Sequence, residues 1–251
     1  MKQRIKDGLY ALKTSAFAGN VLTLLSGSVV SQLIPLAVYP LVTRWYTPAE
    51  LGLFAAFMTY AGALAVVATM RYDQAILLPA RDEEAGYLFR IAVFVSAIIA
   101  GFSWVFVQVA GSWFGAVTGL QKLQHVFWLL PLAVLFTGLF NSMNMLANRY
   151  QRYRQIARAA ITQSGTSSAV KLLGGVLSPG AAALIASYIA GHAIAAVWLL
   201  RSMLRHHHLQ RIADFNRLRI RHLMFHYRHF PAYDMPQILV YTISGNLPVL
   251  V

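Results

Sequence analysis

Long apolar runs separated by short polar segments make up most of this chain. A transmembrane helix needs about 20 mostly apolar residues, and six stretches of the sequence meet that requirement. A seventh begins near residue 231 and is still apolar at residue 251. The pattern predicts an all-α, polytopic membrane helix bundle with six complete spans and the start of a seventh, at residues 17–43, 51–70, 91–110, 127–147, 159–177, 181–200 and 231–251.

Basic residues gather in alternate gaps between these runs. Of the 21 lysines and arginines, all but Arg44, Lys122 and Lys171 lie within residues 1–16, 71–90, 149–158 or 201–230. Positively charged loops remain on the cytoplasmic side of a membrane. We therefore expect a cytoplasmic N-terminus. The alternation also supports the span count, because one span more or fewer would place the basic gaps on both sides of the membrane.

The segment before the first run has its own pattern. Residues 1–16 place apolar Ile5 and Leu9 opposite basic Lys2 and Lys6, which is typical of a helix lying in the membrane interface. We interpret residues 1–16 as a short interfacial helix that leads into the first span. Pro35 and Pro40 lie inside that span and are expected to kink it.

Composition excludes several classes of protein. Hydrophobic residues make up 58% and charged residues 12% of the chain, whereas soluble domains carry about 25% charged residues. An ordinary soluble enzyme and a disordered chain are both excluded. The net charge is +13, and the basic residues that cause it lie next to the apolar runs. At that position they would face the anionic lipid headgroups of the membrane. We therefore exclude a nucleic-acid-binding protein. The absence of cysteine rules out disulfides and thiolate metal sites.

Two of the runs carry polar side chains along one helix face. The run at 127–147 and the residue after it carry four polar residues at steps of four, three and four: Thr137, Asn141, Asn144 and Asn148. The run at 159–177 carries three at steps of four: Gln163, Ser167 and Lys171. Such residues either bond one helix to another or line a polar pathway, and the spacing leaves both interpretations open for the asparagines. A lysine in a span costs at least about 2.5 kcal/mol at the helix centre, so Lys171 is expected to face a cavity or an anionic ligand.

A third run has a face of small residues. Ala183, Ser187, Gly191 and Ala195 recur every four residues. Small side chains allow two helices to approach closely in a membrane. We interpret this face as a structural contact between helices.

Motifs for catalysis and metal binding are absent from the sequence. We find no phosphate-binding glycine loop, no zinc-protease motif and no nucleophile elbow. His206, His207 and His208 are consecutive and point in different directions on a helix, so we interpret them as part of a basic loop. Asp82, Glu83 and Glu84 are interpreted as a helix start. We expect no catalytic residue, no cofactor and no metal.

Several stretches resemble one family of bacterial membrane proteins. These are Leu25 to Ala85, above all PLVTRWYTP at 40–48 and RYDQAILLP at 71–79, then NRYQRYRQIARAAITQS at 148–164 and YRHFPAYDMPQILVYTISGNLPVL at 227–250. They look like the polysaccharide biosynthesis membrane proteins, the lipid-linked oligosaccharide (O-antigen type) flippases of the multidrug/oligosaccharidyl-lipid/polysaccharide exporter superfamily. The resemblance covers nearly the whole chain in order.

This resemblance implies a fold of two six-helix lobes around a central cavity, in the bacterial inner membrane. Residues 17–200 would form the N-terminal lobe, 201–230 a basic cytoplasmic inter-lobe loop and 231–251 the first helix of the second lobe. The chain would then be a fragment of a longer protein or a truncated gene product, and a single lobe alone does not enclose a two-lobed cavity. The implied activity is flipping of a polyprenyl-diphosphate-linked oligosaccharide to the outer leaflet for surface polysaccharide synthesis.

Candidate residues for the substrate pathway follow from the polar positions. The implied partners are the lipid-linked glycan, membrane lipids and other polysaccharide-assembly proteins. Arg44 and Arg71 could instead anchor the ends of spans, and Asp73 could pair with Arg71. The candidate pathway residues are Lys171, Asn141, Asn144, Gln163, Arg44, Arg71 and Asp234.

Two other functions compete with this expectation. A multidrug or cation antiporter of the same superfamily would need intramembrane carboxylates, and the first six runs contain none. A membrane glycosyltransferase or polymerase would need a large loop with acids or histidines near a substrate. The longest loop, residues 201–230, has one acid, Asp214. We therefore expect a transporter and not an enzyme.

Overall fold

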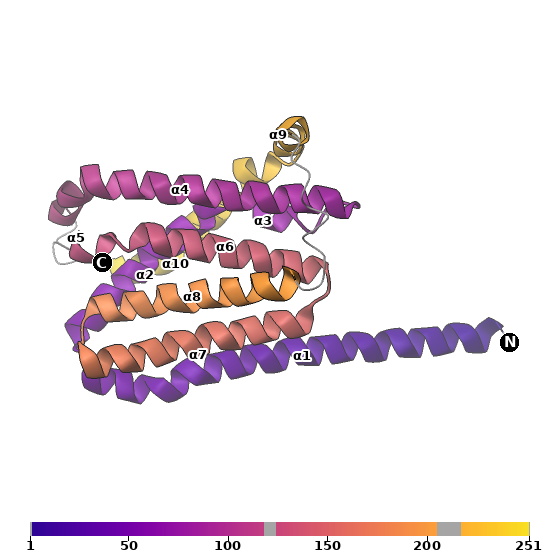
Figure 1. The fold of residues 1–251 in the computed structure, drawn as a ribbon, viewed down its shortest axis with the longest axis horizontal. Helices are drawn as coiled ribbons and strands as arrows, with labels where there is room; N and C mark the ends of the chain where they lie inside the picture. The colour runs from indigo at the N-terminus through magenta and orange to yellow at the C-terminus, as the bar shows by residue number, and fades with distance from the viewer. Residues whose placement is uncertain (1, 118–123, 205–216, 251) are drawn as a thin grey trace.

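The computed structural model describes residues 2–117, 124–204 and 217–250, and Figure 1 shows their arrangement. These residues form helices joined by short turns. The helices are α1 (Lys2–Trp45), α2 (Pro48–Ala68), α3 (Tyr72–Ala75), α4 (Asp82–Val117), α5 (Gln124–Phe127), α6 (Leu130–Arg149), α7 (Tyr153–Leu177), α8 (Ala181–Leu204), α9 (Arg217–His226), the π-helix η3 (Phe230–Asp234) and α10 (Met235–Leu250).

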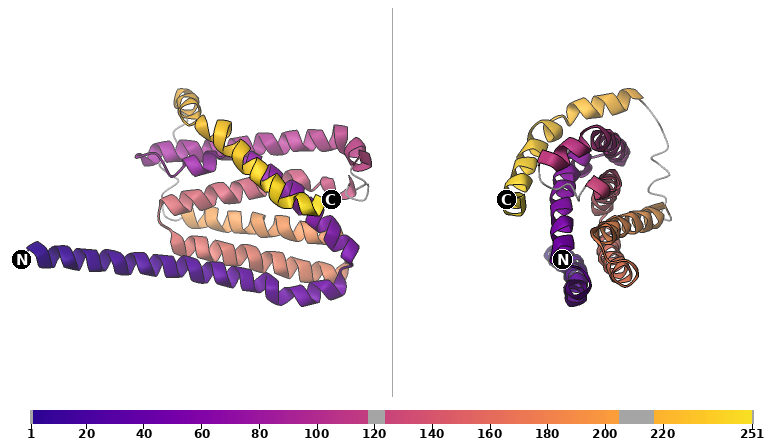
Figure 2. Two further views of the ribbon diagram at one scale, coloured as in Figure 1. Left: turned by 180° about the vertical axis from the view of Figure 1, so that it is seen from behind. Right: turned by 90° about the vertical axis from the view of Figure 1, so that its left-hand side faces the viewer.

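The long helices run side by side in an order that differs from their order in the chain. α1 packs on α7, α7 on α8, α8 on α6, and α6 on α4. α2 crosses this layer and contacts α4, α6 and α8, and α10 lies along α2 (Figure 2). The contacts between α1 and α7 therefore join segments more than a hundred residues apart in the sequence.

Local sequence sets where these helices begin. Thr47 and Glu50 form a capping box at α2: the Thr47 hydroxyl accepts from the Glu50 amide at 3.3 Å, and the Thr47 amide donates to the Glu50 carboxylate at 2.8 Å. Pro48 occupies the first turn, where its missing N–H costs nothing. α4 begins with Asp82, Glu83 and Glu84, which complement the positive end of the helix dipole. The interpretation of these acids as a helix start is confirmed.

Five helices are long and apolar enough to cross a membrane, among the described residues. They include Gly19–Trp45 of α1, Pro48–Ala68, Asp82–Val109, Leu130–Arg149 and Ala181–Leu204. α7 is not among them because its polar face lowers its hydropathy, although its 25 residues lie between two of these helices. A bundle of membrane-spanning helices is confirmed, and the crossing of α7 stays a prediction.

The predicted runs can be compared with the helices. Residues 2–16 and the first run belong to one continuous helix, α1, which extends beyond the bundle (Figure 1) and whose apolar stretch begins at Gly19. The run predicted at 127–147 corresponds to α6, Leu130–Arg149. The segment at 201–230 is not simply a loop, since it contains the end of α8, all of α9 and the start of η3. Lys122 and the three consecutive histidines lie outside the described residues.

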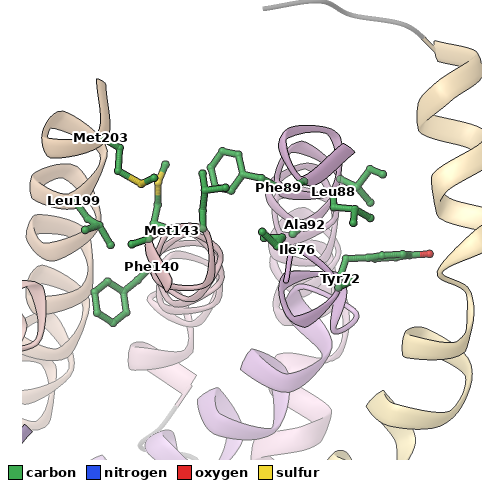
Figure 3. Close-up of a cluster of buried hydrophobic side chains, with 14 of the residues drawn as sticks. Tyr72, Ile76, Leu88, Phe89, Ala92, Phe140, Met143, Leu199 and Met203 are labelled. Carbon is green, nitrogen blue, oxygen red and sulfur yellow. The ribbon is translucent and has the colours of Figure 1, made fainter. Parts of the chain in front are cut away.

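The basic segments lie at one end of the bundle. This end, called the basic end, holds the end of α6, the starts of α4 and α7, the end of α8 and all of α9 (Figure 1). The largest buried cluster lies there and joins α3, α4, α6 and α8. Its members include Tyr72, Ile76, Leu88, Met143 and Leu199, and Figure 3 shows them filling the space between the helices.

The lipid-facing surface is apolar. On α1, Leu22, Leu33 and Leu36 are 65%, 53% and 67% exposed, and on α4 Phe94 and Phe102 are 67% and 68% exposed. Only 6% of the apolar stretch of α1 is buried. Such large apolar surfaces are unfavourable in water and suit a hydrocarbon surrounding.

The small-residue face of α8 contacts α7. A Cβ atom added to Gly191 would lie 2.8 Å from the Gln163 carbonyl oxygen and 3.0 Å from the Ser167 Cβ. A Cβ atom added to Gly174 of α7 would lie 2.7 Å from the Ala183 Cβ. The predicted close contact between helices is confirmed, since neither position has room for a side chain.

Replacing Gly191 with a larger residue should therefore weaken the bundle. We expect Gly191→Ala to destabilise the protein by about 1–3 kcal/mol, because the added methyl meets a backbone oxygen that cannot move freely. Gly165→Ala on α7 is the matched control, since its Cβ would meet nothing within 4 Å, and alanine favours helix by up to about 1 kcal/mol. Thermal unfolding in detergent measures both variants. Equal melting temperatures would contradict the close contact.

Candidate functional site

Lys171 lies on α7 and is surrounded by residues of α1, α2 and α8. Its ammonium group is 5.3 Å from the centre of the Phe54 ring of α2. Its backbone carbonyl accepts a hydrogen bond of 2.7 Å from the Tyr46 hydroxyl. Within the described residues, no carboxylate forms an ion pair with this lysine. A ring face is therefore the only favourable contact of the cation in the described chain.

A cavity of about 220 Å³ lies beside this lysine. Its walls come from α1, α2, α7 and α8, so a movement of any one of these helices would change its shape. Most of the wall is apolar, and the polar side chains in it are those of Tyr39, Ser168 and Lys171. The lining residues are Pro35, Val38, Tyr39, Val42, Leu51, Phe54, Ser168, Lys171 and Leu184.

The depth of Lys171 differs from the expectation. It does not lie at the centre of its helix but in the last two turns of α7, which ends at Leu177. The side chain is partly exposed and near the end of the bundle opposite the basic end. A long lysine side chain at this depth can extend toward water, so the insertion cost is lower than the value for a central lysine.

Asn141 and Asn144 lie on the inward side of α6 but away from the Lys171 cavity. Both are partly buried and share a helix face with Thr137, whose hydroxyl lies 3.1 Å from the Tyr188 hydroxyl of α8. Neither asparagine lines the cavity beside Lys171. Only Thr137 is bonded to a neighbouring helix, so the asparagine amides remain available among the described residues.

Gln163 lies in the middle of α7, where that helix packs closely on Gly191 of α8. Its carbonyl oxygen borders Gly191, and its side chain is partly buried. It is two turns from Lys171 and does not line the same cavity. The polar face of α7 therefore has two parts. Gln163 and Ser167 pack on Gly191 of α8, and Ser168 and Lys171, one turn later, border the cavity.

Arg71 and Asp234 form an ion pair at the basic end. The Arg71 Nε is 3.7 Å from an Asp234 carboxylate oxygen, and it makes no hydrogen bond. Arg71 has a φ of 61°, in the left-handed region, at the turn between α2 and α3. This turn directs the arginine toward η3 and joins the first helices to the start of α10.

The alternative pairing of Arg71 with Asp73 is wrong. The Asp73 carboxylate accepts a hydrogen bond of 2.7 Å from the Thr69 hydroxyl instead and is 4% exposed. The turn after α2 points the arginine outward and the aspartate inward. Arg44 stands apart from both, because it is exposed at the last turn of α1, near the opposite end of the bundle.

Further contacts at the basic end were not predicted. The Arg149 guanidinium donates to the Asp82 carboxylate at 3.0 and 3.2 Å and to the Ile76 carbonyl at 3.1 Å. Burial raises the pKa of Tyr72, whose hydroxyl therefore stays protonated and donates to the Met224 carbonyl of α9 at 3.2 Å. No periodicity signals such contacts, because they join turns far apart in sequence.

The candidate residues do not form one site. Lys171 borders a cavity, Asn141 and Asn144 lie on α6, Arg71 pairs with Asp234, and the remaining two stand separately. Tyr46, Phe54 and Ser168 surround the lysine, and sequence analysis did not select them. Among the described residues, no three histidine, aspartate or glutamate side chains gather as a metal site requires.

The fold and its apolar exterior define the class of protein. Membrane-length helices with buried polar faces and lipid-exposed leucines and phenylalanines form an all-α polytopic membrane bundle. The sequence pattern of the family described as "Polysaccharide biosynthesis protein" matches residues 41–248. The chain therefore belongs to this family of polysaccharide biosynthesis proteins. Neither the curated proteins nor the solved structures compared with the chain gave a match.

The position of Lys171 can be tested with cysteine labelling, because the chain has no native cysteine. We expect Lys171→Cys in membranes to react with a charged, membrane-impermeant thiol reagent, since the side chain borders a cavity and is partly exposed. Ile194→Cys lies in the middle of α8 and is 49% exposed, so it should react only with a lipid-soluble reagent. Labelling of both positions by the lipid-soluble reagent alone would contradict the cavity assignment.

Proposed function

We propose that this protein is a transporter that flips a polyprenyl-diphosphate-linked oligosaccharide from the cytoplasmic to the outer leaflet during surface polysaccharide synthesis, of the O-antigen, capsule or exopolysaccharide type. Membership of the polysaccharide biosynthesis family supports the pathway. The helix bundle supports a membrane step. The observation that carries the proposal is a lysine without an acidic partner beside a cavity between four helices.

The physical requirement of the reaction fits these residues. The diphosphate of a lipid carrier is anionic, and a glycan is rich in hydroxyl groups. Each such group costs several kcal/mol in hydrocarbon when it has no partner (about 2–7 kcal/mol for an uncharged group). The Lys171 ammonium would pair with the phosphate, while the amides of Asn141, Asn144 and Gln163 would bond hydroxyl groups.

Arg71, Asp234 and Arg44 have separate roles in this proposal. The Arg71–Asp234 pair bridges the turn after α2 and the start of α10, so it would hold these elements together until the substrate competes for the arginine. Arg44 at the opposite end would meet the substrate where it leaves. The positive-inside rule supports placing the basic end in the cytoplasm of a bacterial cell, together with the N-terminus.

A cation antiporter is less well supported. Ion-coupled antiport would need a carboxylate within the spans. In the candidate spans of the described chain, carboxylates lie only in the first turns of α2 and α4. The buried acid Asp73 lies in the turn region between those spans and bonds Thr69. We also propose transport rather than catalysis, because the side chains beside the cavity include no paired acids or histidine.

Substitution of Lys171 tests this function directly. In a strain that depends on this protein for its surface polysaccharide, we expect Lys171→Met to lower transport roughly thirtyfold, equivalent to about 2 kcal/mol for the loss of one partner in a desolvated charge pair. Lys171→Arg should keep most of the activity because it keeps the charge.

The control for this test is on the same helix. Arg158→Gln removes one positive charge from an exposed position near the start of α7 and should transport normally. Protein amounts in the membrane are compared by immunoblotting. Normal polysaccharide with Lys171→Met at equal amounts of protein would overturn the assigned role.

A further inference from the structure

The helix α9 lies across the outside of α4 at the basic end of the bundle. It is seen nearly end-on in Figure 1 and lengthwise in the right-hand view of Figure 2, so its axis crosses the direction of the spans. Its inner face is attached: Leu223 is 6% exposed in the main buried cluster, and Arg219 pairs with Glu83 at 3.3 Å. α9 is therefore held against the start of α4, close to the charged residues at the basic end.

The outer face of α9 is both apolar and basic. Leu218 and Phe225 are 79% and 67% exposed and, being seven residues apart, share one face roughly opposite Leu223. Arg221 lies beside them on the exposed side of the helix. The Arg228 guanidinium stacks 4.3 Å above the Phe225 ring. We call Leu218, Arg221, His222, Phe225 and Arg228 the α9 surface.

An open hollow of about 630 Å³ lies on this surface. The five residues of the α9 surface line it together with Tyr72 and Met224. The Tyr72 hydroxyl is held by the Met224 carbonyl, which fixes the floor of the hollow. Within the described residues, neither Arg221 nor Arg228 forms an ion pair. The hollow therefore offers uncompensated positive charge next to exposed apolar side chains.

We propose that the α9 surface binds the phosphate headgroup of an anionic phospholipid in the leaflet at the basic end. Arg221 and Arg228 contact the phosphate, while Leu218 and Phe225 insert between the acyl chains. Basic side chains flanking apolar ones on a helix in the interface plane are the pattern that binds anionic lipid. This site is distinct from the Lys171 cavity and does not depend on which molecule the protein transports.

The lipid explains features that no contact within the described chain accounts for. Two large apolar side chains, Leu218 and Phe225, remain exposed on a helix whose other face is buried. A soluble acidic partner would satisfy the arginines but leave Leu218 and Phe225 in water. A lipid satisfies both, because it carries an anion and an apolar chain in one molecule.

Lipid binding to the purified protein in detergent tests the proposal. We expect fluorescent phosphatidylglycerol to bind more tightly than the zwitterionic phosphatidylcholine analogue. Arg221→Gln with Arg228→Gln should weaken phosphatidylglycerol binding about thirtyfold, or roughly fivefold for each arginine, because one basic residue at an anionic surface contributes about 1 kcal/mol. Soluble glycerol phosphate should not compete at the same concentration.

A matched control separates a site from general attraction. Arg154→Gln with Arg158→Gln removes the same charge from exposed positions on α7 at the same end of the bundle, and it should bind phosphatidylglycerol like the unaltered protein. Equal weakening in both double variants would overturn the site. Equal affinity for the two phospholipids, or equally tight binding of glycerol phosphate, would also overturn it.

Insertion is measured separately in vesicles. A spin label at Leu218→Cys should become accessible to oxygen and protected from a water-soluble nickel complex when vesicles contain phosphatidylglycerol. The labelled residue is exposed, so the fold should tolerate it. A label that remains equally accessible to the nickel complex with and without phosphatidylglycerol would show that Leu218 does not enter the leaflet.

Discussion

The absence of water in the bilayer core is the constraint on which the rest of this structure depends. Every backbone amide and carbonyl in the hydrocarbon must be bonded within the protein, which leaves helices as the solution for a chain with this pattern. The same constraint makes each charge in a span expensive. The described structure accordingly consists of helices with an apolar outer surface, and the charges of its long helices lie toward the helix ends, with Lys171 in the last two turns of α7.

Helix packing in such a medium relies on close contact and internal hydrogen bonds rather than on exclusion of water. α7 and α8 meet at glycine and alanine, and Thr137 bonds Tyr188 across α6 and α8. His192 is packed in the same way, since its ring lies edge-on to Phe140 and its Nδ1 contacts the Tyr188 carbonyl at 3.0 Å. Lys171, by contrast, lies beside its cavity and forms no ion pair within the described residues.

The basic end is organised differently. Three ion pairs there join Arg71 to Asp234, Arg149 to Asp82 and Arg219 to Glu83. Their side chains are partly or largely exposed, so each contributes little stability by itself. Their effect is to fix positions. They link the turn before α3 to η3, the start of α4 to the end of α6, and the start of α4 to α9.

Much of the architecture could be predicted from the sequence. The length of an apolar run, and the side of the membrane on which its flanking charges lie, both depend on local composition. The spans, the helix start at Asp82 and the small-residue face of α8 followed from this information. The partner of Arg71 and the surroundings of Lys171 could not be predicted, since they depend on which helices become neighbours. The sequence pattern also did not show that residues 2–16 and the first span form one unbroken helix, because a polar segment can either extend a helix beyond the membrane or leave it at an angle.

The central claim is that the protein moves a lipid-linked glycan across a bilayer. It is tested most directly in vesicles that contain the purified protein and a fluorescent polyprenyl-diphosphate oligosaccharide in both leaflets, to which a membrane-impermeant glycosidase is added. The account predicts that nearly all the glycan is cleaved, because molecules from the inner leaflet reach the outside. Cleavage that stops at the outer-leaflet fraction, as in protein-free vesicles, would contradict it.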